Sequence, residues 1–221
     1  MPLLSPSIGG VDPPDPPSVA RTEVLRRRAV GLALLIVVWD VVEGVVAVTA
    51  GLAAGSVALV GFGLDSAIEV FAASVVLWQL HGGSAGRQRP ALRAIAVTFF
   101  MLAIYVAAEA VLGLIGGGDA EASGVGIVLN VLALVVMLPV AVAQGRTGTE
   151  MGNEVVSAQS RETWLSNVLS VNVLVGLGLN AAFGLAWADP LVALVVSGFA
   201  AYAGVDAWRE SGEREQQAGS M

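Results

Sequence analysis

Five acidic residues lie well inside long apolar segments of the sequence: Asp40, Glu43, Asp65, Glu69 and Glu109. A charged Asp at the centre of a membrane-spanning helix costs about 2.5 to 3.5 kcal/mol on insertion scales. No Lys or Arg occurs at a comparable depth in these segments, so an internal ion pair is not expected to neutralise the acids. The carboxylates are therefore expected either to carry protons or to bind a cation.

Asp65 and Glu69 have the spacing that most favours a cation site. Four residues apart, they share one helical face, one turn from each other. Asp65 comes nine residues after Ser56, where its segment begins, which places it roughly 14 Å deep, near the bilayer midplane. That depth is typical of a transport site. The pair can bind a divalent ion through oxygen atoms or take up protons. The alternative is a protonated pair bonded to neighbouring backbone or Ser and Asn side chains.

The positions of the other three acids do not point to a single role. Asp40 and Glu43, three residues apart, share a face of the first apolar segment. They either form an access path, complete the cation site as accessory ligands, or are protonated groups bonded to neighbouring helices. Glu109 stands alone in its segment, which favours a structural or helix-contact role.

Composition indicates the elements that must position these acids. The 221 residues are 56% hydrophobic and 13% charged, with a mean hydropathy of +0.78, which excludes an ordinary soluble protein. Apolar runs predict an all-α membrane protein with six transmembrane helices, at 29–50, 56–80, 94–116, 123–144, 163–185 and 188–208. The fifth helix can begin as early as Val155, because a polar stretch leads into it. The predicted transmembrane domain is 29–208.

The basic residues predict the orientation of these helices. All 11 are Arg, and they fall before the first helix, between the second and third, between the fourth and fifth, and after the sixth. In a six-helix arrangement these positions all lie on the same side of the membrane, so the positive-inside rule predicts that both termini are cytoplasmic. Residues 1–28 are expected to form a disordered, Pro-rich cytoplasmic tail and 209–221 a short cytoplasmic tail. The expected location is the bacterial inner membrane, as a multi-pass integral protein.

Charge and residue usage exclude several other functions. A net charge of −7 argues against nucleic-acid binding. The chain has no Cys and only one His, so thiolate and imidazole-rich metal sites are excluded. The single His, His81, is expected to be a solvated loop residue. No phosphate-binding loop or nucleophile constellation is recognisable. The protein is therefore not expected to be an enzyme or to need a cofactor.

The run GSVALVGFGLDSAIEV, positions 55–70, resembles the second helix of the cation diffusion facilitator (cation efflux) transporters, whose pattern ends in Asp-x-x-x-Asp. By this resemblance Asp65 and Glu69 fall on the two metal ligands of that helix, with Glu in place of the second Asp. The resemblance extends over most of residues 21–209. Only a short polar stretch follows the sixth helix, so the chain is similar to the truncated branch that lacks the C-terminal cytoplasmic domain.

The fifth helix departs from the family pattern, which is His or Asp followed by Asp four residues later. One register places Thr163 and Asn167 at these positions, and a shift of one residue places Glu162 and Ser166 there. Neither register restores the second carboxylate. Glu162, Thr163 and Asn167 nevertheless carry oxygen donors, and they are the predicted partners of the second helix.

The resemblance implies export of a divalent cation by proton-coupled alternating access, with zinc as the usual substrate and a homodimer formed through transmembrane helices. An all-oxygen ligand set also suits Mn²⁺ or Fe²⁺. The depleted fifth helix leaves open a scaffold or regulatory subunit that keeps the fold without transport. A proton-coupled exporter of small organic cations is a third reading.

Overall fold

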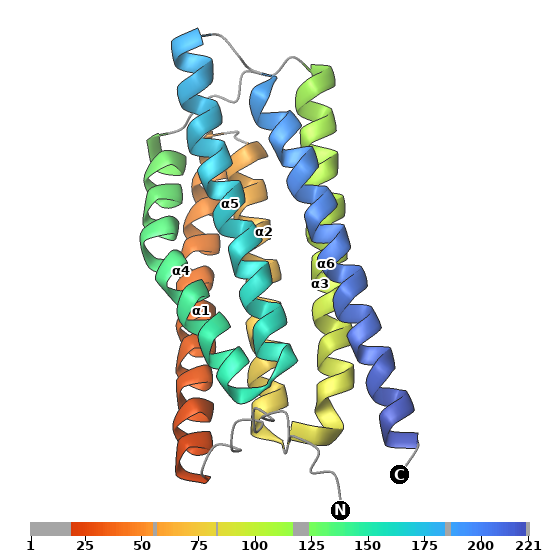
Figure 1. Cartoon of the computed structure of the whole chain (residues 1–221). Helices are drawn as coiled ribbons and strands as arrows, with labels where there is room; N and C mark the ends of the chain where they lie inside the picture. Colours follow the sequence, from red (N-terminus) through yellow and green to blue (C-terminus); the bar gives the residue numbers. More distant parts are fainter. Residues whose placement is uncertain (1–18, 55–56, 83, 117–123, 184–186, 220–221) are drawn as a thin grey trace, which may run out of the picture.

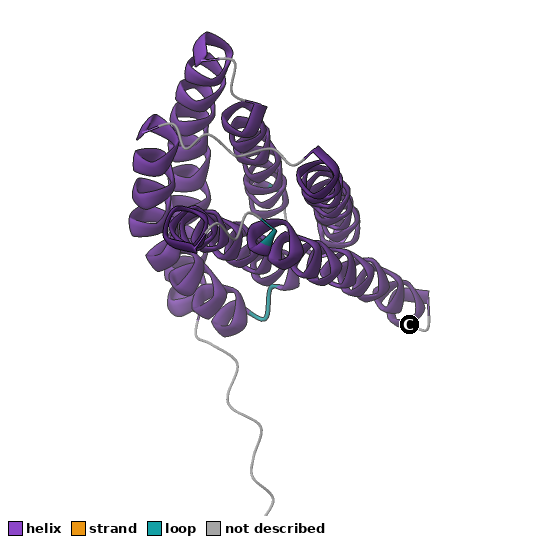
Figure 2. Cartoon of the chain, turned by 90° about the horizontal axis from the view of Figure 1, so that it is seen from above, coloured by secondary structure: helices purple, strands orange, loops and turns teal. Residues whose placement is uncertain are grey.

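The computed structural model describes residues 19–54, 57–82, 84–116, 124–183 and 187–219. Within these ranges the regular elements are six helices, with no strand (Figure 2). Their bounds are α1 (Val19–Ala54), α2 (Val57–His81), α3 (Ser84–Gly116), α4 (Gly124–Met151), α5 (Glu154–Phe183) and α6 (Ala188–Gly219). The predicted all-α, six-helix fold is confirmed.

The helix α1 begins ten residues before its predicted start, at Val19 rather than 29. Glu23 pairs with Arg26 and with Arg27, at spacings of three and four residues. Such pairs stabilise a helical turn in water, so the polar residues preceding the apolar run are helical. The boundary predicted at residue 28 therefore lies inside α1, while the predicted disorder of residues 1–18 falls outside the described residues.

Other helices also extend beyond their apolar runs. The helix α3 begins at Ser84, α4 continues to Met151, and α6 continues to Gly219, through most of the segment expected to be a tail. These extensions all lie at the end of the bundle where α1 begins and α6 ends, called the terminal end below (Figure 1). Hydropathy detects the part of a helix that matches the apolar bilayer, so it does not detect where a helix continues into water.

The six helices pack mainly as three pairs. Contacts are densest between α3 and α6, between α1 and α2, and between α4 and α5, and α1 also packs against α4 (Figure 1). The largest apolar core lies near the terminal end, around Phe99, Leu92 and Ile95 of α3. The arginines of the described helices lie towards this same end, as the sequence predicts.

The helix α5 carries several buried polar side chains. By length and hydropathy, the described parts of α1, α2, α3, α4 and α6 can each cross a membrane. In α5, the buried polar side chains include Gln159, Glu162, Asn167 and Ser170. Because these polar side chains are buried against other helices, α5 fits a bundle that spans the bilayer.

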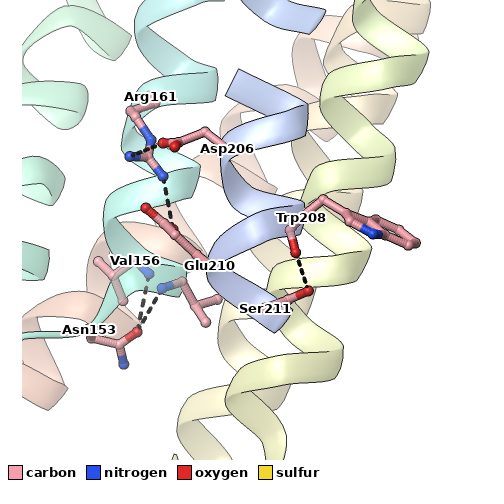
Figure 3. A network of polar contacts seen from close by, with 8 residues as sticks. Asn153, Val156, Arg161, Asp206, Trp208, Glu210 and Ser211 are labelled. Atoms are coloured by element: carbon pink, nitrogen blue, oxygen red, sulfur yellow. Dashed lines mark hydrogen bonds and ion pairs between the residues drawn. The ribbon is translucent and has the colours of Figure 1, made fainter. Parts of the chain in front are cut away.

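Polar contacts hold the first turns of α5 at the terminal end (Figure 3). The Asn153 side-chain oxygen accepts hydrogen bonds from the backbone N–H groups of Val155 and Val156, which caps the helix. Two turns later, the Arg161 guanidinium pairs with Asp206 and Glu210 of α6, both at 3.4 Å. Asn153 thus caps the first turn of α5, and partly exposed ion pairs join α5 to α6.

Candidate cation site

Two glycines allow α1 and α2 to approach closely beside the acidic residues. A methyl group at Gly63 would lie 2.6 Å from Cγ2 of Val48 and 3.0 Å from the backbone oxygen of Gly44. One at Gly44 would lie 3.3 Å from the backbone oxygen of Gly63. Asp40 precedes Gly44 by one helical turn. The close approach therefore brings the acids of α1 next to those of α2.

Three helices contribute a group of buried acidic residues, called the carboxylate cluster below: Asp40, Glu43, Asp65, Glu69 and Glu162. Glu69 lies within electrostatic range of the other four. The Asp40 carboxyl group lies beside that of Glu69 and within electrostatic range of Glu43 and Asp65. The cluster thus brings together acids separated by up to 122 positions in the sequence.

Few hydrogen-bond donors reach the carboxylate cluster. The Ser166 hydroxyl donates to Asp65 Oδ2 at 2.8 Å, and the Trp39 indole N–H donates to Glu43 Oε2 at 3.1 Å. Within the described residues, seven of the ten carboxylate oxygens are buried without a hydrogen-bond partner. Since a buried polar atom without a partner costs free energy, the cluster is suited to a cation or to protons.

A small cavity adjoins the cluster, with room for about one water molecule. Its acidic lining consists of Glu43, Asp65 and Glu69, and α5 contributes the neutral side chains of Ser166, Asn167 and Ser170. The polar atoms of these six side chains are oxygens, apart from the amide nitrogen of Asn167. The thioether of Met137 is also part of the wall.

The structure distinguishes the two registers predicted for α5. Ser166 bonds to Asp65, and Glu162 lies within electrostatic range of Glu69, so the register with Glu162 and Ser166 faces α2. Asn167 also lines the cavity, while its amide donates to the Thr163 carbonyl at 2.8 Å. The Thr163 hydroxyl is buried and donates to a carbonyl of its own helix, and Thr163 does not line the cavity.

Sequence reasoning did not assign Ser66 and Ser170, which both line the cavity. Ser170 follows Ser166 by four residues on α5, and this spacing alone would have placed both on one face. His81, by contrast, is exposed at the last residue of α2, with Nδ1 2.9 Å from the Leu77 carbonyl of its own helix. It lies three turns from Glu69 and takes no part in the cluster.

The carboxylates share an interior without converging on one point. Among the described residues, no three His, Cys, Asp or Glu side chains have a mutual spacing that would hold a metal ion. Ionised carboxylates repel one another. Holding an ion would therefore require side chains of α1, α2 and α5 to move towards each other.

Comparison with known families finds one match that covers more than half of the chain. The family model described as the cation efflux transmembrane domain matches residues 93–214. The matched segment includes most of α3, all of α4 and α5, and most of α6, and it contains Glu162, while α1 and α2 lie outside it. No curated protein matches the sequence.

Proposed function

The chain belongs to the cation efflux family, and on that premise we propose that it exports a divalent metal cation in exchange for protons, using the carboxylate cluster. Membership makes it a multi-pass membrane transporter of metal cations. The observation that supports the finer proposal is the burial of five carboxylates on three helices, with most of their oxygens lacking a donor. The terminal end, which carries the arginines, is proposed to face the cytoplasm.

Charge balance explains how one set of acids can serve two ions. A divalent cation balances two carboxylate charges, and the remaining acids of the cluster become neutral when they bind protons. Metal ligands must be deprotonated to bind, so an arriving metal ion displaces protons, and protons arriving from the other side favour its release. Ser166 holds one oxygen of Asp65 at 2.8 Å and leaves the other available.

The donors around the cavity favour cations that accept oxygen ligands. Carboxylate, hydroxyl and amide oxygens suit Mn²⁺, as well as Fe²⁺ or Zn²⁺, whereas the imidazole and thiolate ligands typical of zinc sites are not among the lining residues. The proposed substrate is therefore a divalent first-row metal ion, with zinc and manganese as the first two to test.

The test is metal uptake into proteoliposomes loaded with a metal-sensitive dye, comparing the parent protein with the double variant Asp65→Asn, Glu69→Gln. We expect saturable uptake by the parent and none by the double variant. The matched control is Asp206→Asn, Glu210→Gln, which removes two acids with the same spacing on α6. The pairs of these two acids with Arg161 are partly exposed and are each worth only about 0 to 1 kcal/mol, so transport should persist.

Three outcomes would contradict the proposal. Unchanged uptake by the Asp65 and Glu69 double variant would show that the cluster does not carry the ion. If the purified parent binds no metal saturably, the scaffold or regulatory reading is favoured. Protection of a host strain against an organic cation but against no metal would favour the exporter of organic cations instead.

A further inference from the structure

The face of α2 that carries Asp65 and Glu69 continues one turn further to Gly61. At Gly61, α2 meets two oxygen-bearing side chains of α3, those of Tyr105 and Glu109. A methyl group at Gly61 would overlap the Tyr105 hydroxyl and would lie 3.3 Å from Oε1 of Glu109. Only a glycine at this position leaves room for the hydroxyl against the backbone of α2.

Tyr105 and Glu109 form a unit next to the carboxylate cluster. They are four residues apart on α3, and the Tyr105 hydroxyl is hydrogen-bonded to the Glu109 carboxylate. Tyr105 also lies within electrostatic range of Asp65. The structure thus gives Glu109 neighbours that its isolated position in the sequence does not indicate.

Three residues of α2 mark successive depths along the bundle at regular intervals, and each is called a level below. Gly61, Asp65 and Glu69 are each four residues apart, or about 6 Å along the helix axis, on one face. Gly61 is the level nearest to the start of α2, which lies at the end of the bundle opposite the terminal end (Figure 1). Tyr105 and Glu109 therefore lie between Asp65 and that end.

Solvent exposure increases from Asp65 towards the end of the bundle opposite the terminal end. The side chain of Asp65 is buried, with 9% of its surface exposed, whereas Glu109 is exposed. One carboxylate and one hydroxyl also attract a cation less than five carboxylates do. An ion that leaves the buried cluster towards this end would meet a weaker and more accessible group of oxygen donors, as release requires.

We propose that Glu109 and the Tyr105 hydroxyl form a second, weaker cation-binding site, on the path between Asp65 and the end of the bundle opposite the termini. This inference rests on the proposed transport function. The site takes the same divalent cation as the cluster and holds it briefly during its passage. Gly61 is the positioning residue that lets the hydroxyl reach this place.

The experiment measures Mn²⁺ and Zn²⁺ uptake into proteoliposomes by the full-length protein and by Glu109→Gln, Glu109→Asp and Tyr105→Phe. For Glu109→Gln we expect a maximal rate about tenfold lower, which corresponds to about 1.4 kcal/mol. Glu109→Asp keeps the charge and should recover most of the rate, and Tyr105→Phe should fall between the two. The matched control is Glu150→Gln, an exposed carboxylate of α4 paired with Arg21 at the terminal end, which should match the parent.

Equilibrium metal binding to the detergent-solubilised protein separates this role from a structural one. Glu109→Gln should keep the parent's tight metal stoichiometry and affinity, because the cluster is intact, while its transport is slow. If Glu109→Gln transports as fast as Glu150→Gln, or if Glu109→Asp is as slow as Glu109→Gln, the second site is refuted while the proposed function stands. If the parent transports neither ion, the proposed function itself fails.

Discussion

Replacing Gly63 with Ala should separate α1 from α2 and weaken the carboxylate cluster. The added methyl group would lie 2.6 Å from a Val48 methyl carbon, 3.0 Å from the Gly44 oxygen and 3.2 Å from the Val48 nitrogen. The Val48 side chain can rotate, but the two backbone atoms cannot move without the helix. Overpacking of this kind costs about 1 to 3 kcal/mol.

The control for this prediction is Gly31→Ala in the exposed part of α1, where an added methyl group meets no atom within 4 Å. Both substitutions gain up to about 1 kcal/mol of helix propensity, because Ala is a better helix former than Gly. The difference between the two variants therefore isolates the cost of overpacking. For a chain of this size, about 1 to 3 kcal/mol corresponds to a melting temperature roughly 2 to 12 °C lower for Gly63→Ala.

The assay is thermal unfolding in detergent, followed by metal uptake in proteoliposomes. Gly63→Ala should unfold at a lower temperature than Gly31→Ala and transport more slowly, since Asp40 is displaced from Glu69. Equal melting temperatures and equal uptake for the two variants would refute the reasoning. They would show that the close approach of α1 and α2 does not hold the cluster together.

Two more predictions concern the start of α5 and the effect of pH. Asn153→Ala removes the cap of α5 and the hydrogen bond to Gln79, so the melting temperature should fall, with about 0.5 to 2 kcal/mol lost from the cap alone. Asn153→Asp keeps the accepting oxygen, so its melting temperature should fall less than that of Asn153→Ala. An equal fall for the two variants would argue against capping. Acidification should raise the Kd for metal, because protons compete for the same oxygens. Calorimetry in buffers of different ionisation enthalpy should detect proton release, and a Kd independent of pH would contradict shared occupancy.

The six helices could be predicted from the sequence because each contains an apolar run long enough to cross a bilayer. Their ends could not be predicted in the same way. Val19 of α1 and Gly219 of α6 lie in polar segments, where helix formation depends on local pairs such as Glu23 with Arg26 and on packing.

The candidate site was predictable only in part. The shared face of Asp65 and Glu69 follows from their spacing within one helix, and spacing needs no tertiary structure. Spacing alone does not show which side of α5 faces Asp65 and Glu69, because neighbouring residues on a helix point about 100° apart. A shift of one position exchanges Thr163 for Glu162, and tertiary contacts distinguish the two: Ser166 bonds to Asp65, and Glu162 lies near Glu69.

By itself, the sequence determined that acids lie in apolar helices while the arginines collect at helix ends, since both are properties of single segments. Tertiary structure decided which acids meet. The glycines of α1 and α2 admit a close approach that places Asp40 beside Glu69, and the packing of α3 on α2 brings Glu109 to Gly61. These contacts depend on how side chains of different helices fill the space between them, and the sequence of one helix does not contain that information.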